Sequence, residues 1–159
     1  MVSLYRILSV TLDYDVFVKN KDYFITETDM IIKQLCESDG LMNVHNFAGD
    51  YHLYMNIADS KLIIDICDAP RINKVTHIFS LNPFLGIFEE YREIKNAYKH
   101  ALSGDTSLQL ETIDMARRGV HNQAADMLIE RFARKMTIDF ETARHFFSIF
   151  VLLLESRML

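Results

Sequence analysis

Five polar residues, spread over nine positions, form the part of this chain that is best suited to chemistry. They are Asp114, Arg117, Arg118, His121 and Asn122, within the stretch IDMARRGVHN. Guanidinium groups bind carboxylates and phosphates through paired N–H donors, and imidazole transfers protons near neutral pH. One hypothesis is therefore a small enzyme or metabolite-binding protein in which the two arginines and Asn122 bind an anionic small molecule. His121 would be the catalytic acid or base, and Asp114 would orient it.

The same residues also suit a structural role. Side chains three or four positions apart are neighbours on a helix, so Asp114 can pair with Arg117 or Arg118. At about 100° per residue, Asp114, Arg118 and His121 alternate with apolar groups, which predicts that they are half-buried and that His121 has a partner on another element. The protein would then be a binding or interaction protein in which the cluster fixes the geometry of the helices. The sequence leaves both alternatives open.

Three helices are expected around this cluster, in residues 83–102, 110–132 and 140–155. The first repeats apolar residues every 3.6 positions, and we interpret its charged side as facing solvent. Asn82 before Pro83 predicts the cap of that helix, and Asp139 predicts the cap of the last one. Residues 146–154 are apolar on nearly all sides, so the last helix is either a central core helix or the interface of a homodimer.

The N-terminal half has the pattern of a sheet. Residues 4–12 are rich in β-branched and large apolar side chains and predict a first strand. Residues 51–57 and 61–67 alternate apolar and polar positions around a short turn, which predicts a hairpin. Residues 75–81 predict another strand that ends at the first of the three helices.

A short helix and the fold class complete the expected architecture. Thr26 begins an approximate capping box, and Gly40 predicts the end of the same helix. We therefore expect an α+β protein with an antiparallel sheet of about four strands, one N-terminal helix and three C-terminal helices. Residues 1–159 would form a single domain, in which residues 1–81 are mainly strands plus one helix and residues 82–159 are helical.

The overall composition restricts the classes of partner. The net charge of −5 repels phosphate backbones and anionic lipids, so we expect no nucleic-acid partner. The longest apolar run, in residues 146–154, is far shorter than the about 20 residues that cross a bilayer, so we expect no membrane association. The N-terminus lacks the pattern of a signal peptide, and Cys36 and Cys67 suit free thiols. Together these features predict a soluble cytoplasmic protein.

No motif for a metal or an organic cofactor can be drawn from the sequence. The five glycines are scattered and form neither GxGxxG nor GxxxxGK[ST]. His45, His52 and His77 lack the spacing of metal ligands, and Ser80 lacks the GxSxG turn of a nucleophile. We therefore expect no metal and no cofactor.

Several stretches of the C-terminal half resemble Uncharacterised Protein Family 0262, a set of small bacterial proteins. They are THIFSLNPF, EEYREIKNAY, IDMARRGVHN, ERFARKM and DFETARHFF, within residues 75–150, and RRGVHN is the most specific part. The resemblance implies a conventional intracellular bacterial protein and carries over no catalytic role for any residue. Leu85 and Gly86 stand where the family pattern has a basic pair, which weakens the case for a phosphate-binding groove.

Overall fold

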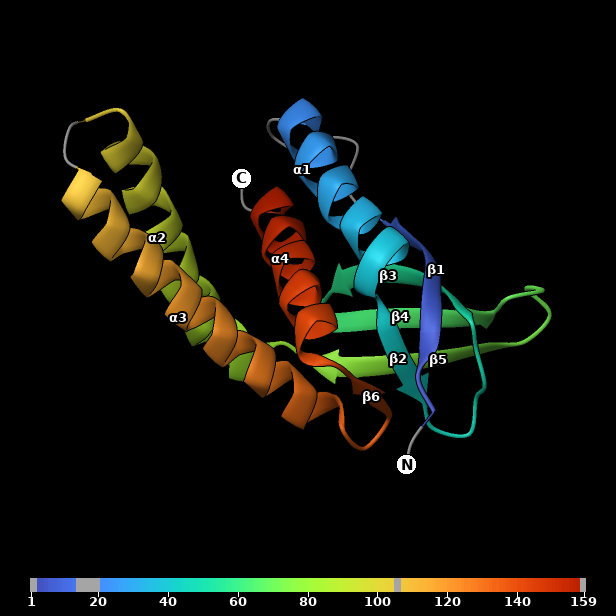
Figure 1. The fold of residues 1–159 in the computed structure, drawn as a ribbon. Coiled ribbons are helices and arrows are strands. Elements are labelled where there is room, and N and C mark those ends of the chain that lie inside the picture. The colour runs from blue at the N-terminus through green and yellow to red at the C-terminus, as the bar shows by residue number, and fades with distance from the viewer. Residues whose placement is uncertain (1–2, 14–20, 105–106, 158–159) are drawn as a thin grey trace.

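The computed structural model describes residues 3–13, 21–104 and 107–157. Within these residues, helices pack against one face of a sheet (Figure 1). The strands are β1 (Tyr5–Leu12), β2 (Leu41–Val44), β3 (Tyr51–Ala58), β4 (Lys61–Asp68), β5 (Lys74–Ser80) and β6 (Met136–Ile138). The helices are α1 (Lys21–Gln34), α2 (Leu85–Leu102), α3 (Ser107–Phe132) and α4 (Phe140–Ser156). A π-helical turn, η1 (Leu35–Asp39), follows α1, and a 3-10 turn, η2 (Asn82–Phe84), precedes α2.

The described strands form a sheet in the order β5-β4-β3-β1-β2-β6. β1 and β3 are parallel, and the other neighbouring pairs are antiparallel. The predicted α+β class is confirmed, and the described elements include four α-helices, although β6 interrupts the expected helical C-terminal half. The predicted antiparallel sheet of about four strands is wrong, because the described sheet has six strands and is mixed. After β1, the chain passes through α1 and β2 before β3 pairs with the other side of β1, which permits the parallel pairing.

The two strands that the sequence does not predict are both short. β2 has four residues and β6 has three, too few to show a recognisable alternation. The two strands pair with each other, and the partners Met42 and Ile138 are both buried. β6 lies between α3 and α4, so the expectation that residues 82–159 are entirely helical is wrong. β6 forms because it pairs with β2 in the buried core, and a local sequence pattern does not predict such a pairing.

The starts of two helices differ from prediction. α1 begins at Lys21, so Thr26 lies inside the helix and is not its cap. Asn82 belongs to η2, and the residue that precedes α2 is Phe84. α1 thus begins earlier than its predicted capping residue indicates, and α2 is entered through a 3-10 turn instead of directly from a cap.

Two predicted helix boundaries are confirmed. Asp139 caps α4, because its Oδ1 accepts a hydrogen bond from the main-chain N–H of Thr142 at 2.9 Å. Gly40 ends the segment of α1 and η1, and its N–H donates to the Leu35 carbonyl at 2.7 Å. A Cβ at Gly40 would lie 2.4 Å from that carbonyl oxygen, so the turn requires glycine.

The predicted hairpin of β3 and β4 is confirmed. Its turn residues Asp59 and Ser60 have φ angles of 52° and 59°, as in a two-residue type I′ turn. One face of the hairpin is buried in the core by Tyr51, Leu53, Met55, Ile57, Leu62, Ile64 and Ile66. The opposite face carries mainly polar side chains, including His52, Tyr54 and Asp65.

α4 is the central helix of the core. Its large buried apolar residues are Phe146, Phe147, Ile149, Phe150, Val151, Leu152 and Leu153. Their rings contact two other helices, with Phe147 stacked on Phe88 of α2 at 5.3 Å and Phe150 lying 6.4 Å from Phe132 of α3. The chain itself therefore buries this apolar stretch, and a homodimer through α4 stays a prediction. No helix in the described ranges is both long and apolar enough to span a bilayer.

Candidate functional site

α3 places Asp114 between the two arginines of the cluster. Arg117 Nη2 lies 2.7 Å from Asp114 Oδ1, and Arg118 Nη2 lies 2.9 Å from Asp114 Oδ2. The hydrogen bond from Arg117 and the charges of both arginines lower the pKa of Asp114, although partial desolvation opposes them. The predicted pairing is therefore confirmed. Both carboxylate oxygens face arginines, so Asp114 is engaged with them and not with His121.

His121 is half-buried and joins α3 to α2 and α4. Its Nε2 donates to the main-chain carbonyl of Arg144 at 2.8 Å and lies 3.2 Å from Ser148 Oγ. Its ring centroid lies 5.5 Å from that of Tyr91 and 5.6 Å from that of Phe147. The predicted partner on another element is thus confirmed, and it belongs to α4.

The surroundings of His121 limit its chemistry. Burial lowers the pKa of His121 from 6.5 to about 4, and the nearby cations Arg144 and Arg117 lower it too, against the opposing hydrogen bond to the Arg144 carbonyl. The ring is therefore neutral at pH 7, and the nitrogen that bears its proton donates to main chain. Proton transfer at neutral pH needs a group whose pKa lies near 7. This geometry suits a structural contact better than an acid or base.

Arg118 and Asn122 lie on the outer flank of α3. The Arg118 side chain is 67% exposed, against 34% for Arg117, and Asn122 is exposed. The prediction that Arg118 is half-buried is wrong, because one position along a helix turns the side chain by about 100°. Arg117 consequently faces α2, where its guanidinium carbon lies 5.4 Å from the centre of the Tyr98 ring. Of the predicted ligand-binding residues, the structure brings Arg117 to α2 but leaves Arg118 and Asn122 in solvent.

A hollow of about 390 Å³ lies beside Arg117, lined by residues of α1, α2, α3 and α4. Its cationic groups are Lys95, Lys99 and Arg117, and its carboxylate is Glu27. α4 supplies an apolar floor that includes Val151 and Leu152, and three tyrosines stand around it. These are Tyr23 of α1 and Tyr91 and Tyr98 of α2.

The three cations of this hollow differ in how their charge is compensated. Arg117 is paired with Asp114, and Lys95 Nζ lies 3.6 Å from the carboxylate of Glu155. Lys99 Nζ lies 3.4 Å from the hydroxyl of Tyr23 and 4.9 Å from the centre of that ring. Among the described residues, Lys99 forms no ion pair. Its ammonium group is therefore the cation best placed to meet an incoming anion.

A second hollow of about 300 Å³ adjoins the first and shares Ile31 and Ser148 with it. His121 and Arg144 line this second hollow, and Glu141 lies 3.6 Å from the Arg144 guanidinium. Because both hollows follow α4 between α1 on one side and α2 or α3 on the other, they form one groove. We call it the helical groove, defined by the linings of the two hollows.

The sequence interpretation missed the α2 side of this groove. Lys95 and Lys99 were expected on a solvent-facing side; Lys99 is indeed exposed and Lys95 is half-buried, but both also line the first hollow beside tyrosines. The available signal was a stripe at spacings of three and four, formed by Tyr91, Lys95, Tyr98, Lys99 and Leu102. Tyrosine within a lysine stripe indicates that the face meets another element.

The remaining sequence candidates are separated in the structure. His52 and His77 lie on opposite faces of the sheet, and His45 follows β2. In the ranges that the structure describes, no three metal-binding side chains gather. Ser80 Oγ accepts a hydrogen bond from the Asn82 N–H at 3.3 Å, a local turn contact.

The chain is similar to a group of bacterial proteins. A UPF0262 protein of Rhizobium etli (strain CIAT 652) is 35% identical over 145 residues, covering 91% of this chain and 92% of that protein. A UPF0262 protein of Agrobacterium fabrum is 33% identical with the same coverage. A third, of Sphingopyxis alaskensis, is 34% identical over 95% of this chain and 94% of that protein. No solved structure matches the chain.

The family resemblance is not confined to the helical half. The Uncharacterised protein family (UPF0262) matches residues 4–157, from the start of the first strand to the end of the last helix. Both the helical groove and the sheet therefore lie within the matched region. With a match over nearly the whole length and relatives about one-third identical, the chain belongs to the Uncharacterised protein family (UPF0262).

Proposed function

We propose that the protein binds a small anionic molecule with an apolar body in the helical groove, without transforming it. The observation that carries this proposal is the first hollow, where Lys95, Lys99 and Arg117 stand around the apolar floor of α4. Cations above such a floor favour a ligand with a carboxylate or phosphate at one end and a hydrocarbon or aromatic portion at the other.

Lys99 is the principal anion contact in this proposal. Its charge has no carboxylate partner among the described residues, whereas Arg117 and Lys95 are partly compensated by Asp114 and Glu155. An anion at Lys99 would exchange a weak contact with the Tyr23 hydroxyl for a charge-assisted hydrogen bond. Arg117 would add a second favourable charge without leaving Asp114.

The size and remaining charge of the hollow limit the ligand further. A volume of about 390 Å³ lies in the range of about 300–1,000 Å³ that is usual for small-molecule sites. Glu27 lines the same hollow and would repel a second anionic group. A molecule with one anionic group and a compact apolar body fits these limits best.

Binding without catalysis follows from the position of His121. Burial lowers the pKa of His121 to about 4, and its ring proton is donated to the Arg144 carbonyl, so His121 itself is not poised to transfer protons near neutral pH. The cytoplasm is the proposed location, supported by Cys36 and Cys67, which are both free thiols.

The test uses a fluorescent probe of the proposed chemistry. The sulfonate dye ANS combines one anionic group with aromatic rings, and octanoate combines a carboxylate with an alkyl chain. We expect ANS to bind with increased fluorescence and octanoate to displace it. Lys99→Gln should weaken ANS binding at least about tenfold, because a charge-assisted hydrogen bond contributes about 1.5–3 kcal/mol.

Lys33→Gln is the matched control. Lys33 is exposed on α1 and does not line the hollow, and its substitution changes the net charge by the same amount. The control should bind ANS as the native protein does. If Lys99→Gln bound ANS as tightly as the native protein does, the proposed site would be contradicted. If both variants lost the same affinity for ANS, the loss would be a nonspecific effect of net charge.

A further inference from the structure

The face of the sheet away from the core carries a connected polar cluster. Ser9 of β1 lies opposite His52 of β3, and Ser9 Oγ is 2.6 Å from His52 Nδ1. Arg71, from the turn between β4 and β5, donates from Nη2 to the same ring nitrogen at 3.3 Å and from Nη1 to the Tyr54 hydroxyl. Because guanidinium can only donate, His52 Nδ1 is an acceptor here. The register of β1 shifts between Ile7 and Ser9, as it does at a β-bulge.

The turn that presents Arg71 is built around Asp68. Asp68 Oδ1 accepts hydrogen bonds from the N–H groups of Ile72 and Asn73 at 2.9 and 3.2 Å, and Oδ2 accepts one from the Asn73 side chain. Desolvation raises the pKa of Asp68, but these hydrogen bonds lower it by more. Arg71 itself has a φ of 60°, a conformation that non-glycine residues rarely adopt. The turn therefore holds Arg71 in a conformation that returns its side chain to β3.

Arg71 has a charge that the described residues leave uncompensated. Its acceptors are a hydroxyl and a ring nitrogen, and it forms no ion pair with a carboxylate in the described part of the chain. A guanidinium group prefers an oxyanion that takes two of its N–H groups. The Ser9 hydroxyl can rotate to donate to the same oxyanion. This end of the cluster therefore suits a phosphate group.

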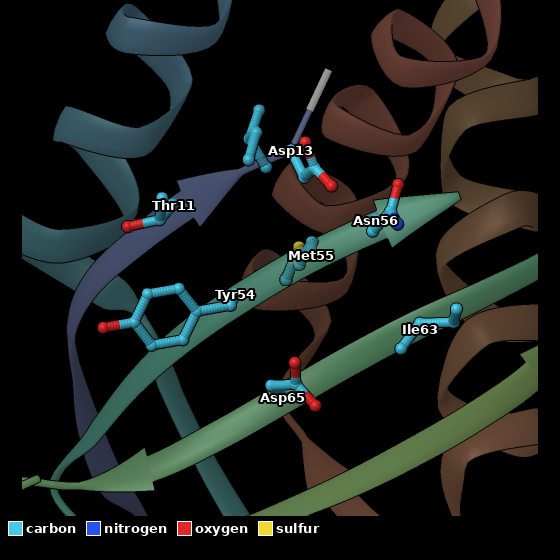
Figure 2. Close-up of a pocket in the computed structure, with 8 residues that line it drawn as sticks. Thr11, Asp13, Tyr54, Met55, Asn56, Ile63 and Asp65 are labelled. Carbon is cyan, nitrogen blue, oxygen red and sulfur yellow. The ribbon is translucent and has the colours of Figure 1, made fainter. Parts of the chain in front are cut away.

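A hollow of about 310 Å³ adjoins Tyr54 on the same face of the sheet. Figure 2 shows Tyr54, Ile63 and Asp65 along neighbouring strands, with Thr11 beside Tyr54 and with Asp13 near Asn56. Carboxylate and amide oxygens accept hydrogen bonds from hydroxyl groups, and a tyrosine ring with an isoleucine offers an apolar surface to C–H groups. This end therefore suits a body with several hydroxyl groups.

The balance of charge decides between classes of ligand. The carboxylates are Asp13 and Asp65, and the latter already accepts from the Thr76 hydroxyl. Two arginines outside the lining donate to residues within it, Arg71 to the Tyr54 hydroxyl and Arg157 from Nη2 to Asn56 Oδ1 at 2.8 Å. Because carboxylates and guanidinium groups both stand at this surface, it favours neither a polyamine nor a polyanion. A molecule with one anionic end and a neutral hydroxylated body matches it.

We propose that this face of the sheet binds a sugar phosphate, with the phosphate on Arg71 and Ser9 and the sugar hydroxyls in the hollow beside Tyr54 and Asp65. The site is separate from the helical groove, which lies on the other side of the sheet. The two proposals therefore fail independently.

Isothermal titration of the full chain with three probes tests this site. The probes are glucose 6-phosphate, inorganic phosphate and glucose. We expect glucose 6-phosphate to bind at least about tenfold more tightly than inorganic phosphate, because only it occupies both ends. Arg71→Gln should abolish binding of both phosphates within the measurable range. Asp65→Asn should weaken glucose 6-phosphate and leave inorganic phosphate unchanged.

Arg131→Gln is the control, since Arg131 is exposed on α3 and its substitution removes the same charge. Circular dichroism and ANS binding show whether Arg71→Gln retains the fold and the helical groove. The proposal is overturned if glucose 6-phosphate does not bind, if inorganic phosphate binds equally well, or if Arg131→Gln weakens binding as much as Arg71→Gln does. If Arg71→Gln loses the circular dichroism spectrum of the folded protein, Ser9→Ala takes its place in the titrations. Unchanged binding of glucose 6-phosphate and inorganic phosphate by Ser9→Ala would then overturn the proposal.

Discussion

The inner and outer flanks of α3 have different roles although their polar residues are neighbours in sequence. On the inner flank, Arg117 faces the Tyr98 ring, and His121 packs against Tyr91 and donates to the backbone of α4. On the outer flank, Arg118 and Asn122 face solvent. Residue type does not separate the two flanks, since each has an arginine. The opposing element decides whether a polar side chain packs against another helix or faces solvent.

Removal of the ring behind His121 should produce the largest effect. Phe147 is fully buried, and its ring contacts Phe88 at 5.3 Å and Tyr91 at 5.2 Å. Phe147→Ala should lower the free energy of unfolding by about 3–5 kcal/mol, because it removes apolar contacts and leaves a cavity. Urea denaturation followed by circular dichroism measures the change. Met115→Ala, at a side chain of α3 that is 67% exposed, should change it by less than about 0.5 kcal/mol.

The second-largest effect should be a fall in the free energy of unfolding at acid pH, caused by His121 on the inner flank. The pKa of His121 is about 4 in the folded protein and about 6.5 in an unfolded chain, so the unfolded state takes up the proton first as the pH falls. The contribution of neutral His121 is complete above about pH 6.5 and is lost progressively towards pH 4. The loss approaches about 3 kcal/mol. Unfolding free energies measured at several pH values test this for the native protein and for His121→Gln.

The difference in unfolding free energy between the native protein and His121→Gln, followed over pH, gives the contribution of His121 alone. Carboxylates such as Asp114, whose pKa is lowered by Arg117, add acid sensitivity at lower pH to both proteins. The native protein should therefore lose stability more steeply than His121→Gln between pH 6.5 and 4. Parallel curves over that interval would mean that His121 is accessible to protons in the folded protein.

The long elements are predictable from sequence because many residues carry each pattern. β3 and β4 alternate over eight positions each, and the buried set on their inner face matches the prediction. β2 and β6 are not predictable in this way, because Met42 and Ile138 become strand residues by pairing across the core. The parallel pairing of β1 with β3 also depends on the path of the whole chain.

The candidate site is predictable only where it lies on one helix. The spacing of three and four positions predicts the pairing of Asp114 with its arginines, and the half-burial of His121 predicts a partner. The position of Lys99 in the helical groove could not be predicted, because it depends on how α2 lies against α1. A helical wheel describes one element, whereas a groove is a relation among several.

The paired arginines offer a sharper test of the two flanks. Arg117→Gln should lower the free energy of unfolding by about 1 kcal/mol, because it removes a half-buried ion pair and the contact with Tyr98. Arg118→Gln should lower it by less than about 0.5 kcal/mol, since that side chain is mostly exposed. The two variants have equal net charge, so each controls the other. Thermal denaturation at matched ionic strength compares them, and equal losses would contradict the distinction between the flanks.

Asn122→Ala should have the smallest effect. Asn122 is exposed one position after His121, and alanine is a better helix former than asparagine, so the free energy of unfolding should change by less than about 0.5 kcal/mol. ANS binding should match that of the native protein, because Asn122 does not line either hollow of the groove. Thermal denaturation and ANS titration measure both quantities in one sample. Weaker ANS binding without a loss of stability would place the ligand on the outer flank, since no change in the fold could then explain it.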